Sequence, residues 1–558
     1  MPWPSSSTAA SRPPQVADTV WSLLGVGAAG DPALLAEDGR VLTHDELRAT
    51  VTRLRERMRG LGVGVGDRIA IVLPNGPAMA VAFLAAAVTG CAAPLNPRYR
   101  SDELRFYLKD LRARVLITDD SGGEAAREAA GDHVLGLRMQ GSLDALDLVP
   151  DHRRADEGMS RTLIPDSIRD PQPATDSSHG ADISGGIADP GPDDVALVLH
   201  TSGTTSRPKI VPLRQRNLGC SAAAIADSLR LTAADRSLNV MPLFHIHGLL
   251  AGLLAPLSVG GSVVATDGFD AFGFFGQLRC FRPTYYTAVP TMHQMALARS
   301  ARHAEEARSA GLRFVRSSSA SMPAPVLIEL QGLFGVPVIE AYGMTEATHQ
   351  MCANPLPPGE AKTQSVGLPT GIELAILDEA GRPQPPGTRG EVCIKGPTVI
   401  DGYEANPAAD EAAFTGGWFR TGDEGHVDGD GYLYLTGRLK EQINRGGEKV
   451  SPLEVDEVLL RHEAVAQAVT FAVPHEKLGE DVAAAVVLVP GTAATEAELR
   501  QHVGRSLAAF KIPRRVVFCD DLPKGPTGKL QRIGLAQRLG LTQPTEPDAE
   551  SLPAEEEG

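Results

Sequence analysis

One short run of small residues has the composition of a phosphate-binding loop. Residues 201–209 read Thr-Ser-Gly-Thr-Thr-Ser-Arg-Pro-Lys and follow an apolar run at 195–199 that predicts a buried strand. Glycine and hydroxyl residues let a backbone curl around phosphate oxygens and donate hydrogen bonds to them, and Lys209 adds a positive charge. The run lacks the Gly-Lys-Ser/Thr ending of a Walker loop. It therefore predicts a phosphate cradle of another kind, with a flexible Ser/Thr-rich linker as the alternative.

Three later segments carry residues suited to nucleotide chemistry. They are 342–346 (Tyr-Gly-Met-Thr-Glu), 418–423 (Trp-Phe-Arg-Thr-Gly-Asp) with Gly437 and Arg438, and 523–529 (Pro-Lys-Gly-Pro-Thr-Gly-Lys). Glu346 is a hard oxygen ligand of the kind that Mg²⁺ prefers, and Lys529 could neutralise an oxyanion. Plainer interpretations are a helix-start carboxylate for Glu346 and a solvated side chain for Lys529. Asp423 and Arg438 could likewise form a simple surface ion pair.

These four segments, in this order, resemble the adenylate-forming enzymes, which include acyl-CoA synthetases, luciferases and the adenylation domains of peptide synthetases. The resemblance covers about residues 16–541. It implies an AMP-forming acid–thiol ligase that uses ATP and Mg²⁺ to convert a carboxylic acid into acyl-AMP and then transfers the acyl group to CoA. The chemistry needs a triphosphate clamp, a metal ion and a cation where charge builds on the α-phosphate, because a free carboxylate repels nucleophiles.

The resemblance also implies roles for individual residues. For ATP and AMP binding it implies Thr201, Ser202, Gly203, Thr204, Thr205, Lys209, Ser319, Ala320, Ser321, Glu340, Ala341, Tyr342, Thr345, Asp423 and Arg438. Thr345, Glu346 and Lys529 would take part in catalysis, with Glu346 as the Mg²⁺ ligand. Tyr342 would stack on the adenine, and Asp423 would accept hydrogen bonds from the ribose hydroxyls.

The second half-reaction needs a different arrangement, because one cleft cannot easily hold Lys529 and the CoA arm at the same spot. The family solves this by rotating a small C-terminal domain, and its hinge residue matches Lys440. The residues then expected to face CoA are Arg445, Gly446, Gly447 and Glu448. The two glycines let the pantetheine arm pass close to the backbone. An ordinary hairpin turn is the plainer interpretation of this run, and both can hold together.

The acid is indicated by finer features. Ser206 replaces the usual glycine of the phosphate loop, and Ile210 stands where glycine is common. Together with segments 242–252, 317–321, 345–349 and 441–450, they resemble the oxalate–CoA ligases of plants and fungi. A tiny dicarboxylate needs donors for its second carboxylate, whereas a fatty-acid pocket is apolar.

Three residues from separate segments could supply those donors: His245, Ser319 and His349. Protonation of a histidine beside a dianion is favoured, so we expect a charged imidazole there. His245 is also interpretable as a gate or core imidazole, and His349 as a solvent-facing residue. A medium-chain fatty or aryl carboxylate remains the alternative substrate. A module that loads a carrier protein and a non-catalytic binding protein remain alternatives of other classes.

The elements that must hold these residues alternate between strand and helix. Thr43 and Glu46 form a capping box before a helix that Gly60 is placed to end. Strands are expected at 68–73 and 115–118 and a buried helix at 77–89. This alternation predicts parallel sheets covered by helices, that is, a large multi-subdomain α/β domain.

Past Gly437 the pattern changes to a small, mobile α+β domain. Ser451, Pro452 and Glu454 predict a capped helix, followed by strands at 465–473 and 482–489 and a helix at 496–507. The predicted divisions are a disordered N-terminus (1–15), the large domain (16–437) with an insertion or loop (150–192), the small swinging domain (438–541) and an acidic disordered tail (542–558).

Bulk properties fit a soluble enzyme of two or more domains. The 558 residues are 42% hydrophobic and 22% charged, and the net charge of −16 argues against nucleic-acid binding. Because the substrates are anions, the positive charges that bind them must come together in one cleft. The residues expected there are Lys209, Arg438, Arg445, Lys449 and Lys529. The six cysteines form no CxxC pair, which fits a reducing compartment without a metal cluster. The sequence shows no signal peptide, membrane-spanning run or peroxisomal address, so we expect a cytoplasmic enzyme with no stable membrane insertion.

Overall fold

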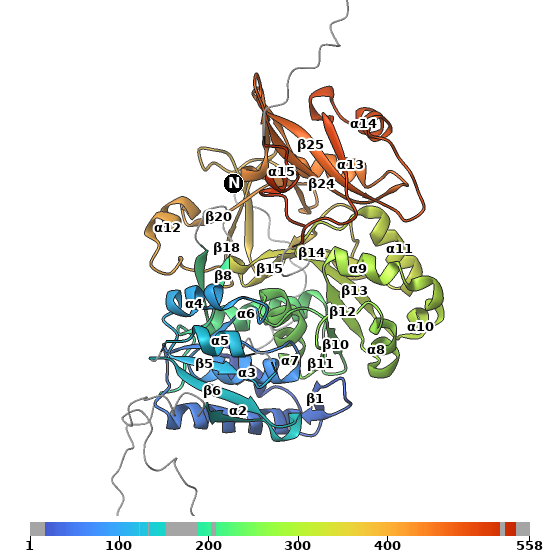
Figure 1. The fold of residues 1–558 in the computed structure, drawn as a ribbon. Helices are drawn as coiled ribbons and strands as arrows, with labels where there is room; N and C mark the ends of the chain where they lie inside the picture. The colour runs from blue at the N-terminus through green and yellow to red at the C-terminus, as the bar shows by residue number, and fades with distance from the viewer. Residues whose placement is uncertain are drawn as a thin grey trace, which may run out of the picture. The chain divides into compact units, whose positions relative to one another are not determined.

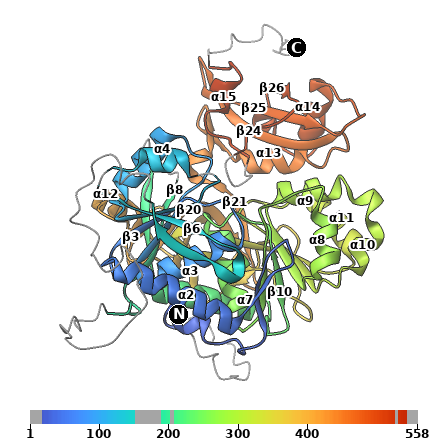
Figure 2. The same cartoon turned by 60° about the horizontal axis from the view of Figure 1, so that its bottom comes forward.

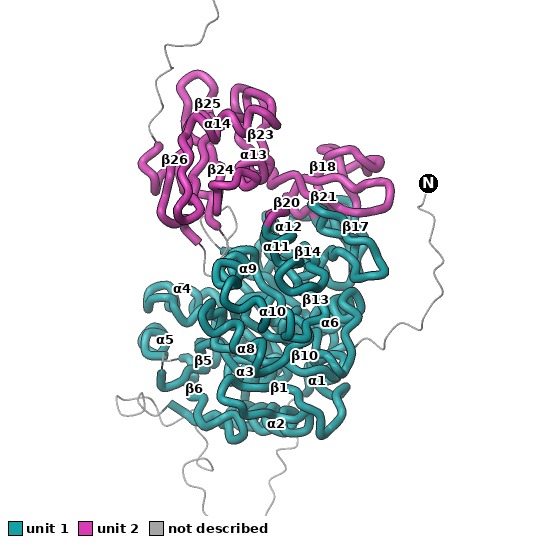
Figure 3. The backbone as a smooth tube through the Cα atoms, turned by 90° about the vertical axis from the view of Figure 1, so that its right-hand side faces the viewer, with its two compact units in different colours: residues 1–322, 326–374, 394–419 teal, residues 323–325, 375–393, 420–558 magenta. Residues whose placement is uncertain are grey.

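The computed structural model describes residues 17–121, 123–131, 133–151, 188–201, 208–524 and 530–542. They form two compact units, shown in different colours in Figure 3. Unit 1 takes the described residues of 1–322, 326–374 and 394–419, and unit 2 takes those of 323–325, 375–393 and 420–558. The predicted disordered N-terminus, the tail beyond residue 542 and most of the 150–192 insertion lie outside the described residues. Within the described ranges, no helix is long and apolar enough to cross a membrane.

Unit 1 contains two sheets whose central strands run parallel, as the alternation of elements predicted. The nine-stranded sheet has the order β16-β15-β14-β13-β12-β10-β11-β1-β2. Its strands are β1 (Pro32–Leu35), β2 (Val41–Thr43), β10 (Arg236–Asn239), β11 (Ser262–Ala265), β12 (Tyr285–Ala288), β13 (Phe314–Ser318), β14 (Val338–Met344), β15 (His349–Ala353) and β16 (Leu368–Pro369). Strands β2, β15 and β16 pair antiparallel at its two edges.

The seven-stranded sheet has the order β7-β6-β5-β3-β4-β8-β9. Its strands are β3 (Arg68–Ile71), β4 (Cys91–Pro94), β5 (Val115–Thr118), β6 (Leu135–Gln140), β7 (Asp147–Pro150), β8 (Val195–Thr201) and β9 (Lys209–Arg214). The two edge strands, β7 and β9, are antiparallel to their neighbours. The hairpin from β8 to β9 contains the ends of the predicted phosphate loop, which joins the two strands.

Helices cover the sheets of unit 1 and bury their apolar faces. They are α1 (Val20–Leu24), α2 (His44–Gly60), α3 (Pro77–Thr89), α4 (Ser101–Asp110), α5 (Glu124–Ala129), α6 (Gln215–Ser228), α7 (Ala255–Leu257), α8 (Phe274–Phe281), α9 (Pro290–Leu297), α10 (Ala304–Ser309), α11 (Ala324–Phe334) and α12 (Pro407–Ala413). In Figures 1 and 2, α8, α10 and α11 group beside β10, β12 and β13, and their apolar side chains share one core cluster with those strands. Val315 of β13 points into this cluster, so Arg316 points to the opposite face of the sheet.

Local sequence signals correctly predicted several of these elements. Thr43 and Glu46 exchange the two hydrogen bonds of a capping box at the start of α2, which ends at Gly60. The expected strands at 68–73 and 115–118 are β3 and β5, and the expected buried helix is α3. The side chains of α3 are buried almost all round, which explains its uniformly apolar sequence.

Unit 2 contains the predicted α+β sheet. Its order is β23-β22-β25-β24, with β26 parallel to β25. The elements are β22 (Ile443–Arg445), β23 (Glu448–Val450), α13 (Pro452–Leu459), β24 (Val465–His475), β25 (Gly479–Leu488), α14 (Glu496–Gly504), β26 (Arg515–Phe518) and α15 (Leu535–Arg538). Figure 2 shows α13, α14 and α15 around β24 and β25. Apolar clusters lie on both faces of this sheet. The predicted fold class, a large α/β part and a small α+β part, is confirmed.

A separate five-stranded sheet has the order β17-β18-β20-β19, with β21 on β20. Its strands are β17 (Glu373–Leu377), β18 (Gly390–Lys395), β19 (Phe414–Thr415), β20 (Trp418–Val427) and β21 (Leu433–Arg438). The antiparallel pair of β20 and β21 sets Asp423 opposite Arg438. The tight turn, where Asp428 accepts hydrogen bonds from the backbone N–H groups of Asp430 and Tyr432, sets the register beside it. A register shift between Glu424 and Gly425 then brings Asp423 opposite Arg438.

Two local predictions in unit 2 are wrong. The Ser451 side chain does not cap α13 but donates to the carbonyl oxygen of Thr436, and Glu454 pairs with Lys511 at 2.6 Å instead of closing a capping box. Helix α14 ends at Gly504 and not at residue 507. At α13 tertiary contacts outweigh a local propensity.

Candidate active site

The predicted phosphate loop connects two paired strands. Thr201 ends β8 and lies opposite Lys209, the first residue of β9. The loop between them starts and ends at the same edge of the sheet, as a phosphate cradle requires. The predicted loop residues Ser202, Gly203, Thr204 and Thr205 lie outside the described residues.

A buried tyrosine links the loop lysine to the predicted metal ligand. The Lys209 ammonium lies 4.2 Å from the centre of the Tyr403 ring, and the Tyr403 hydroxyl donates to Glu346 Oε1 at 2.9 Å. Burial, aided by the charge of Glu346, raises the pKa of Tyr403 far above its ordinary value, so the phenol remains a donor. Tyr403 was not singled out from the sequence, because Asp-Gly-Tyr-Glu at 401–404 carries no distinctive spacing.

Glu346 has the chemistry of a magnesium ligand. It is buried in the short 3₁₀ turn Thr345–Ala347, which refutes the interpretation as the start of a longer helix. A carboxylate can accept at both oxygens, so the hydrogen bond to Oε1 leaves capacity for a cation. Within the described ranges, no three His, Cys, Asp or Glu residues form a metal-binding group. Mg²⁺ takes one or two protein carboxylates and completes its shell with phosphate and water, so a single buried carboxylate such as Glu346 is compatible with it.

The predicted adenine-side segments meet at the carboxyl ends of β13 and β14. Ser318 donates to the carbonyl oxygen of Ala341 at 2.8 Å, and Glu340 Oε1 accepts from the backbone N–H of Met322 at 3.0 Å. These bonds hold residues 319–321 beside residues 340–342. Ligands of parallel α/β sheets bind at this edge.

The predicted acid-binding residues Ser319 and His349 lie against a common ring, that of His247. His247 Nδ1 is 3.1 Å from the Ser319 hydroxyl, and the His247 and His349 rings stack with centres 4.8 Å apart. Both histidines are buried, which removes the interpretation of His349 as a solvent-facing residue. His245 was expected in this role, but it is partly exposed and its Nδ1 accepts from the backbone N–H of His247 at 3.3 Å.

A fully buried arginine lies behind these rings. Arg316 donates from Nη1 to Thr287 Oγ1 at 3.0 Å and to His247 Nε2 at 3.2 Å. From Nη2 it donates to Gln350 Oε1 at 2.9 Å and to His349 Nε2 at 3.2 Å. None of Arg316, Thr287, Gln350 and His247 was singled out from the sequence. One signal was present, since a charged residue interrupts the apolar and small residues of Phe-Val-Arg-Ser-Ser-Ser at 314–319.

In unit 2 the predicted ribose ligands form an ion pair across β20 and β21. Arg438 Nε lies 2.9 Å from Asp423 Oδ1. The Asp423 side chain is 6% exposed and that of Arg438 is 55% exposed. This pair is more buried on its acidic side than an ordinary surface pair, so Asp423 is held in one orientation.

The predicted CoA-facing run forms the tight hairpin between β22 and β23. Gly446 and Gly447 have φ values of +60° and +98°, which a hairpin turn of this kind requires. Arg445 donates from Nε to the buried Asp481 at 2.6 Å, and Glu448 is exposed. Lys440 is exposed in the 3₁₀ turn Leu439–Glu441 that precedes this hairpin. Lys529 lies outside the described residues.

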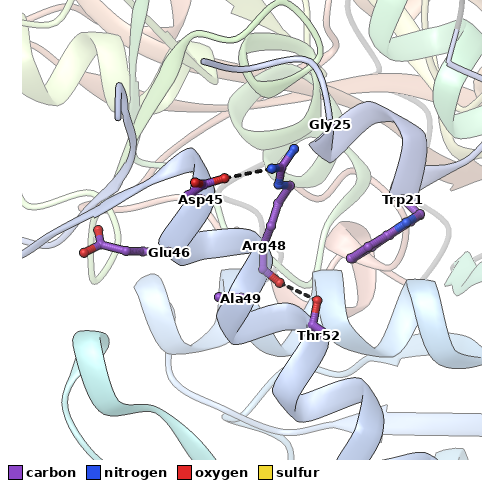
Figure 4. A pocket seen from close by; sticks show the side chains of 7 residues that line it. All are labelled: Trp21, Gly25, Asp45, Glu46, Arg48, Ala49 and Thr52. Atoms are coloured by element: carbon purple, nitrogen blue, oxygen red, sulfur yellow. Dashed lines mark hydrogen bonds and ion pairs between the residues drawn. The ribbon is translucent and has the colours of Figure 1, made fainter. Parts of the chain in front are cut away.

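A surface hollow of about 570 Å³ contains none of the predicted site residues. It lies between α1 and α2 and is lined by Trp21, Gly25, Asp45, Glu46, Arg48, Ala49 and Thr52. Figure 4 shows the 2.7 Å ion pair of Asp45 and Arg48 at its rim. The two charges neutralise each other on an exposed helix face, so this hollow offers no group poised for chemistry.

The hairpin loop, the tyrosine-held carboxylate and the polar pocket together define a nucleotide-dependent α/β enzyme. Residues 26–404 match the family model for AMP-binding enzymes, and residues 454–529 match that for the AMP-binding enzyme C-terminal domain. The chain therefore belongs to the AMP-binding enzyme family. The predicted adenylate-forming class, an acid–thiol ligase that uses ATP and CoA, is confirmed.

Known relatives resemble the chain over most of its length. It is 45% identical over 507 residues to the oxalate–CoA ligase of Arabidopsis thaliana, covering 89% of this chain and 93% of that protein. It is 40% identical over 486 residues to the oxalate–CoA ligase of Saccharomyces cerevisiae, covering 84% and 86%. Among solved structures it resembles ATP-bound MatB from Rhodopseudomonas palustris, with a TM-score of 0.79 and 28% identity over 93% of this chain and 98% of that chain.

Proposed function

We propose that this chain is an oxalate–CoA ligase. In the first step an oxalate oxygen attacks the α-phosphorus of ATP and pyrophosphate leaves. In the second step the CoA thiolate attacks the activated carbonyl carbon, forming oxalyl-CoA and releasing AMP. The observation that carries the proposal is the buried polar cluster of Ser319, His247 and His349, because a pocket for a fatty or aryl acid would be lined by apolar side chains. The two oxalate–CoA ligases to which the chain is similar support the same substrate.

For unit 1 we propose that the 201–209 hairpin loop binds the β- and γ-phosphates. Lys209 would add a positive charge to this cradle, and Glu346 would hold Mg²⁺, which neutralises phosphate charge when bound. The 2.9 Å hydrogen bond from Tyr403 keeps Glu346 oriented. Ser319–Ser321 and Glu340–Tyr342 would enclose the adenine, and Thr345 would contact the α-phosphate.

For unit 2 we propose that Asp423, oriented by Arg438, accepts hydrogen bonds from the ribose hydroxyls. Lys529 would neutralise the charge that develops during adenylation. Lys440 would act as the hinge at the start of the 438–541 domain, and the hairpin at 445–448 would contact CoA. We further propose that the enzyme acts in the cytoplasm on small molecules and does not bind nucleic acid, consistent with its net charge of −16.

The test is AMP and pyrophosphate release in the presence of Mg²⁺, ATP and CoA over a panel of acids that includes oxalate, octanoate and benzoate. We expect oxalate to have the highest kcat/KM by at least about tenfold, a difference of about 1.4 kcal/mol in transition-state binding. Preference for octanoate or benzoate would refute the proposal. Turnover that needs a carrier protein and fails with free CoA would identify a carrier-loading module instead.

A matched pair of variants tests the metal assignment. Glu346→Gln keeps the size and the acceptor for Tyr403 but removes the charge, so we expect the Mg²⁺ concentration for half-maximal activity to rise at least tenfold. Glu404→Gln, a substitution of the same kind close to Tyr403, should leave it unchanged, because Glu404 pairs with Arg68. If both substitutions raise the Mg²⁺ requirement equally, Glu346 is not the metal ligand.

A further inference from the structure

Arg316 is a buried cation without an acidic partner. Its side chain is fully buried, and across the described ranges it forms no ion pair with Asp or Glu. Its Nε atom is also buried without a hydrogen-bond partner among those residues. Burial lowers the pKa of Arg316 to about 10, so the group still carries its charge at neutral pH. A buried charge held only by neutral groups is costly, which indicates that its counter-charge comes from a ligand.

The contacts of Arg316 determine which nitrogen of each histidine carries a proton. A guanidinium has donors and no acceptor. His247 Nε2 and His349 Nε2, each 3.2 Å from Arg316, must therefore be unprotonated acceptors. The proton of each neutral ring then resides on Nδ1. A doubly protonated imidazolium could not accept these bonds, so this arrangement favours neutral histidines in the unliganded enzyme.

Thr287 fits this assignment of His247. Its hydroxyl accepts from Arg316 at 3.0 Å, and because His247 Nε2, 2.6 Å away, is already assigned as an acceptor, the hydroxyl donates its own proton to that nitrogen. His247 Nδ1 then donates to the Ser319 hydroxyl at 3.1 Å, which frees the Ser319 proton for another acceptor. In the hydrogen bonds from Arg316 to Ser319, each group donates to the next. The last group, the Ser319 hydroxyl, can therefore donate to a ligand.

The backbone around these donors is strained. Ser319 has a φ of +75° and His349 a φ of +90°, although neither is glycine. Such conformations cost free energy and concentrate where a side chain must be aimed at a ligand. Gln350, which accepts from Arg316, is itself anchored to Ser228 and Thr370 at 2.9 and 3.1 Å. The guanidinium therefore has a fixed position behind two strained, donor-bearing residues.

We propose that Arg316 is the positioning residue that selects a small dicarboxylate, because it sets His247 and His349 as neutral Nδ1–H donors and supplies the positive charge opposite the second carboxylate. This inference rests on the proposed oxalate–CoA ligase function. His349 and Ser319 donate hydrogen bonds to the acid, His247 Nδ1–H orients the Ser319 hydroxyl, and Arg316 provides the charge without touching the acid. The attraction between unit charges in a partly screened interior corresponds to a preference on the order of 100-fold for a doubly charged acid over a singly charged one of the same shape.

The kinetic test compares oxalate with oxamate, in which an amide replaces one carboxylate at almost the same size. In the wild type we expect oxalate to be preferred on the order of 100-fold in kcat/KM. In Arg316→Met we expect that preference to fall below about fivefold through a rise in the KM for oxalate, with the KM for ATP changed less than about threefold. Arg316→Lys, which keeps the charge but not the forked donors, should recover part of the preference.

Arg236→Met is the matched control. Arg236 lies in β10 of the same sheet and also donates to neutral groups, the Phe281 carbonyl and the Ser262 hydroxyl. It should keep the full preference for oxalate. A wild type that does not use oxalate overturns the proposed function and the inference with it. A wild type that uses oxalate, with an Arg316→Met variant of unchanged selectivity, overturns the inference alone.

A spectroscopic test needs no folded variant of Arg316. In protein labelled with ¹⁵N-histidine, the ring nitrogens of His247 and His349 are assigned by difference from His247→Asn and His349→Asn. We expect both rings of the wild type to show the neutral Nδ1–H tautomer at pH 7.5. Signals of the Nε2–H tautomer or of an imidazolium in the unliganded enzyme would overturn the proposed role of Arg316.

Discussion

Unit 1 contains a fully buried arginine and unit 2 a partly buried one, and the two differ in what neutralises them. In unit 1, Arg316 is fully buried and bonded to a threonine, a glutamine and two histidines. In unit 2, Arg532 has a side chain that is 19% exposed and is bound by two carboxylates, those of Asp456 at 2.9 Å and Glu441 at 3.1 Å. Both guanidinium groups are well ordered by forked hydrogen bonds, so geometry alone does not separate them.

The difference shows how a structural charge can be distinguished from a functional one. Arg532 and its carboxylates neutralise one another, and their cluster joins α13, β24 and the chain near α15 in the core of unit 2. Arg316 has neutral partners only, so its charge is left to act on something that enters the pocket. A buried ion pair is weak evidence for function, whereas a buried charge without a counter-charge is strong evidence for an anionic ligand.

The largest expected effect is the loss of unfolding free energy when Arg532 is replaced. Arg532→Met should lower the free energy of unfolding of unit 2 by about 3–5 kcal/mol at pH 8, because Asp456 would remain as a buried, unpaired carboxylate. Urea unfolding followed by hydrogen exchange in peptides from residues 440–542 measures it. The control is Arg538→Met, which removes an exposed arginine from the neighbouring α15. A loss below about 1 kcal/mol would contradict a structural role for the cluster.

On acidification, one buried group in each unit should change the free energy of unfolding of its unit, and the two changes should have opposite signs. In unit 1, burial lowers the pKa of His293 to about 3, against about 6.5 in the unfolded chain, so only the unfolded state gains a proton below pH 6.5. Its contribution should destabilise unit 1 by about 1.4 kcal/mol per pH unit between roughly pH 6 and 4.

In unit 2, burial raises the pKa of Asp456 to about 6, against about 3.9 unfolded, so the folded state binds the proton first. Its contribution should stabilise unit 2 by up to about 3 kcal/mol over the same fall in pH. Tryptophan fluorescence reports on unit 1, since Trp21 and Trp418 belong to it, and hydrogen exchange reports on unit 2. His293→Gln and Asp456→Asn should each remove the corresponding slope, and slopes that do not change would refute these assignments.

Substitutions at one helix cap in each unit test whether the two units unfold separately. Thr43 caps α2 in unit 1 and Thr495 caps α14 in unit 2, each with a reciprocal glutamate at the third helical position. Thr43→Ala and Thr495→Ala should each cost about 1 kcal/mol. If the units unfold independently, each substitution shifts only the transition of its own unit. A shift of both transitions by either variant would show that they unfold together.

The smallest expected effect is the change in unfolding free energy when Arg316 is replaced. Arg316→Met leaves no buried carboxylate behind and removes a desolvated cation, which offsets the cost of leaving acceptors such as Gln350 Oε1 and His349 Nε2 without their donor. Its unfolding free energy should therefore stay within about 1 kcal/mol of the wild type. The measurement is urea unfolding followed by tryptophan fluorescence at pH 8. A loss as large as that expected for Arg532→Met would mean that Arg316 is structural, and the contrast between the two arginines would disappear.

Much of the architecture could be predicted because its signals are local. The capping pair of Thr43 and Glu46, the apolar runs of β3 and α3 and the paired glycines at 446–447 each determine a few neighbouring backbone angles. The predictions failed where a distant group competed, as when Ser451 bonded to Thr436 instead of capping its own helix. Loop residues 202–207 and Lys529 lie outside the described residues, so their roles remain predictions.

The site was only partly predictable, for the same physical reason. The residue types of its motifs predicted a phosphate-binding loop, and the resemblance of four segments to adenylate-forming enzymes predicted an acid-activating enzyme. Only the tertiary structure showed that His247 contacts Ser319 and His349, that Tyr403 joins Lys209 to Glu346, and that Arg316 bonds to both rings. Arg316 and His247 are 69 positions apart in the chain. Periodicity and propensity act over a few residues, whereas strand register and burial decide which distant side chains share one pocket.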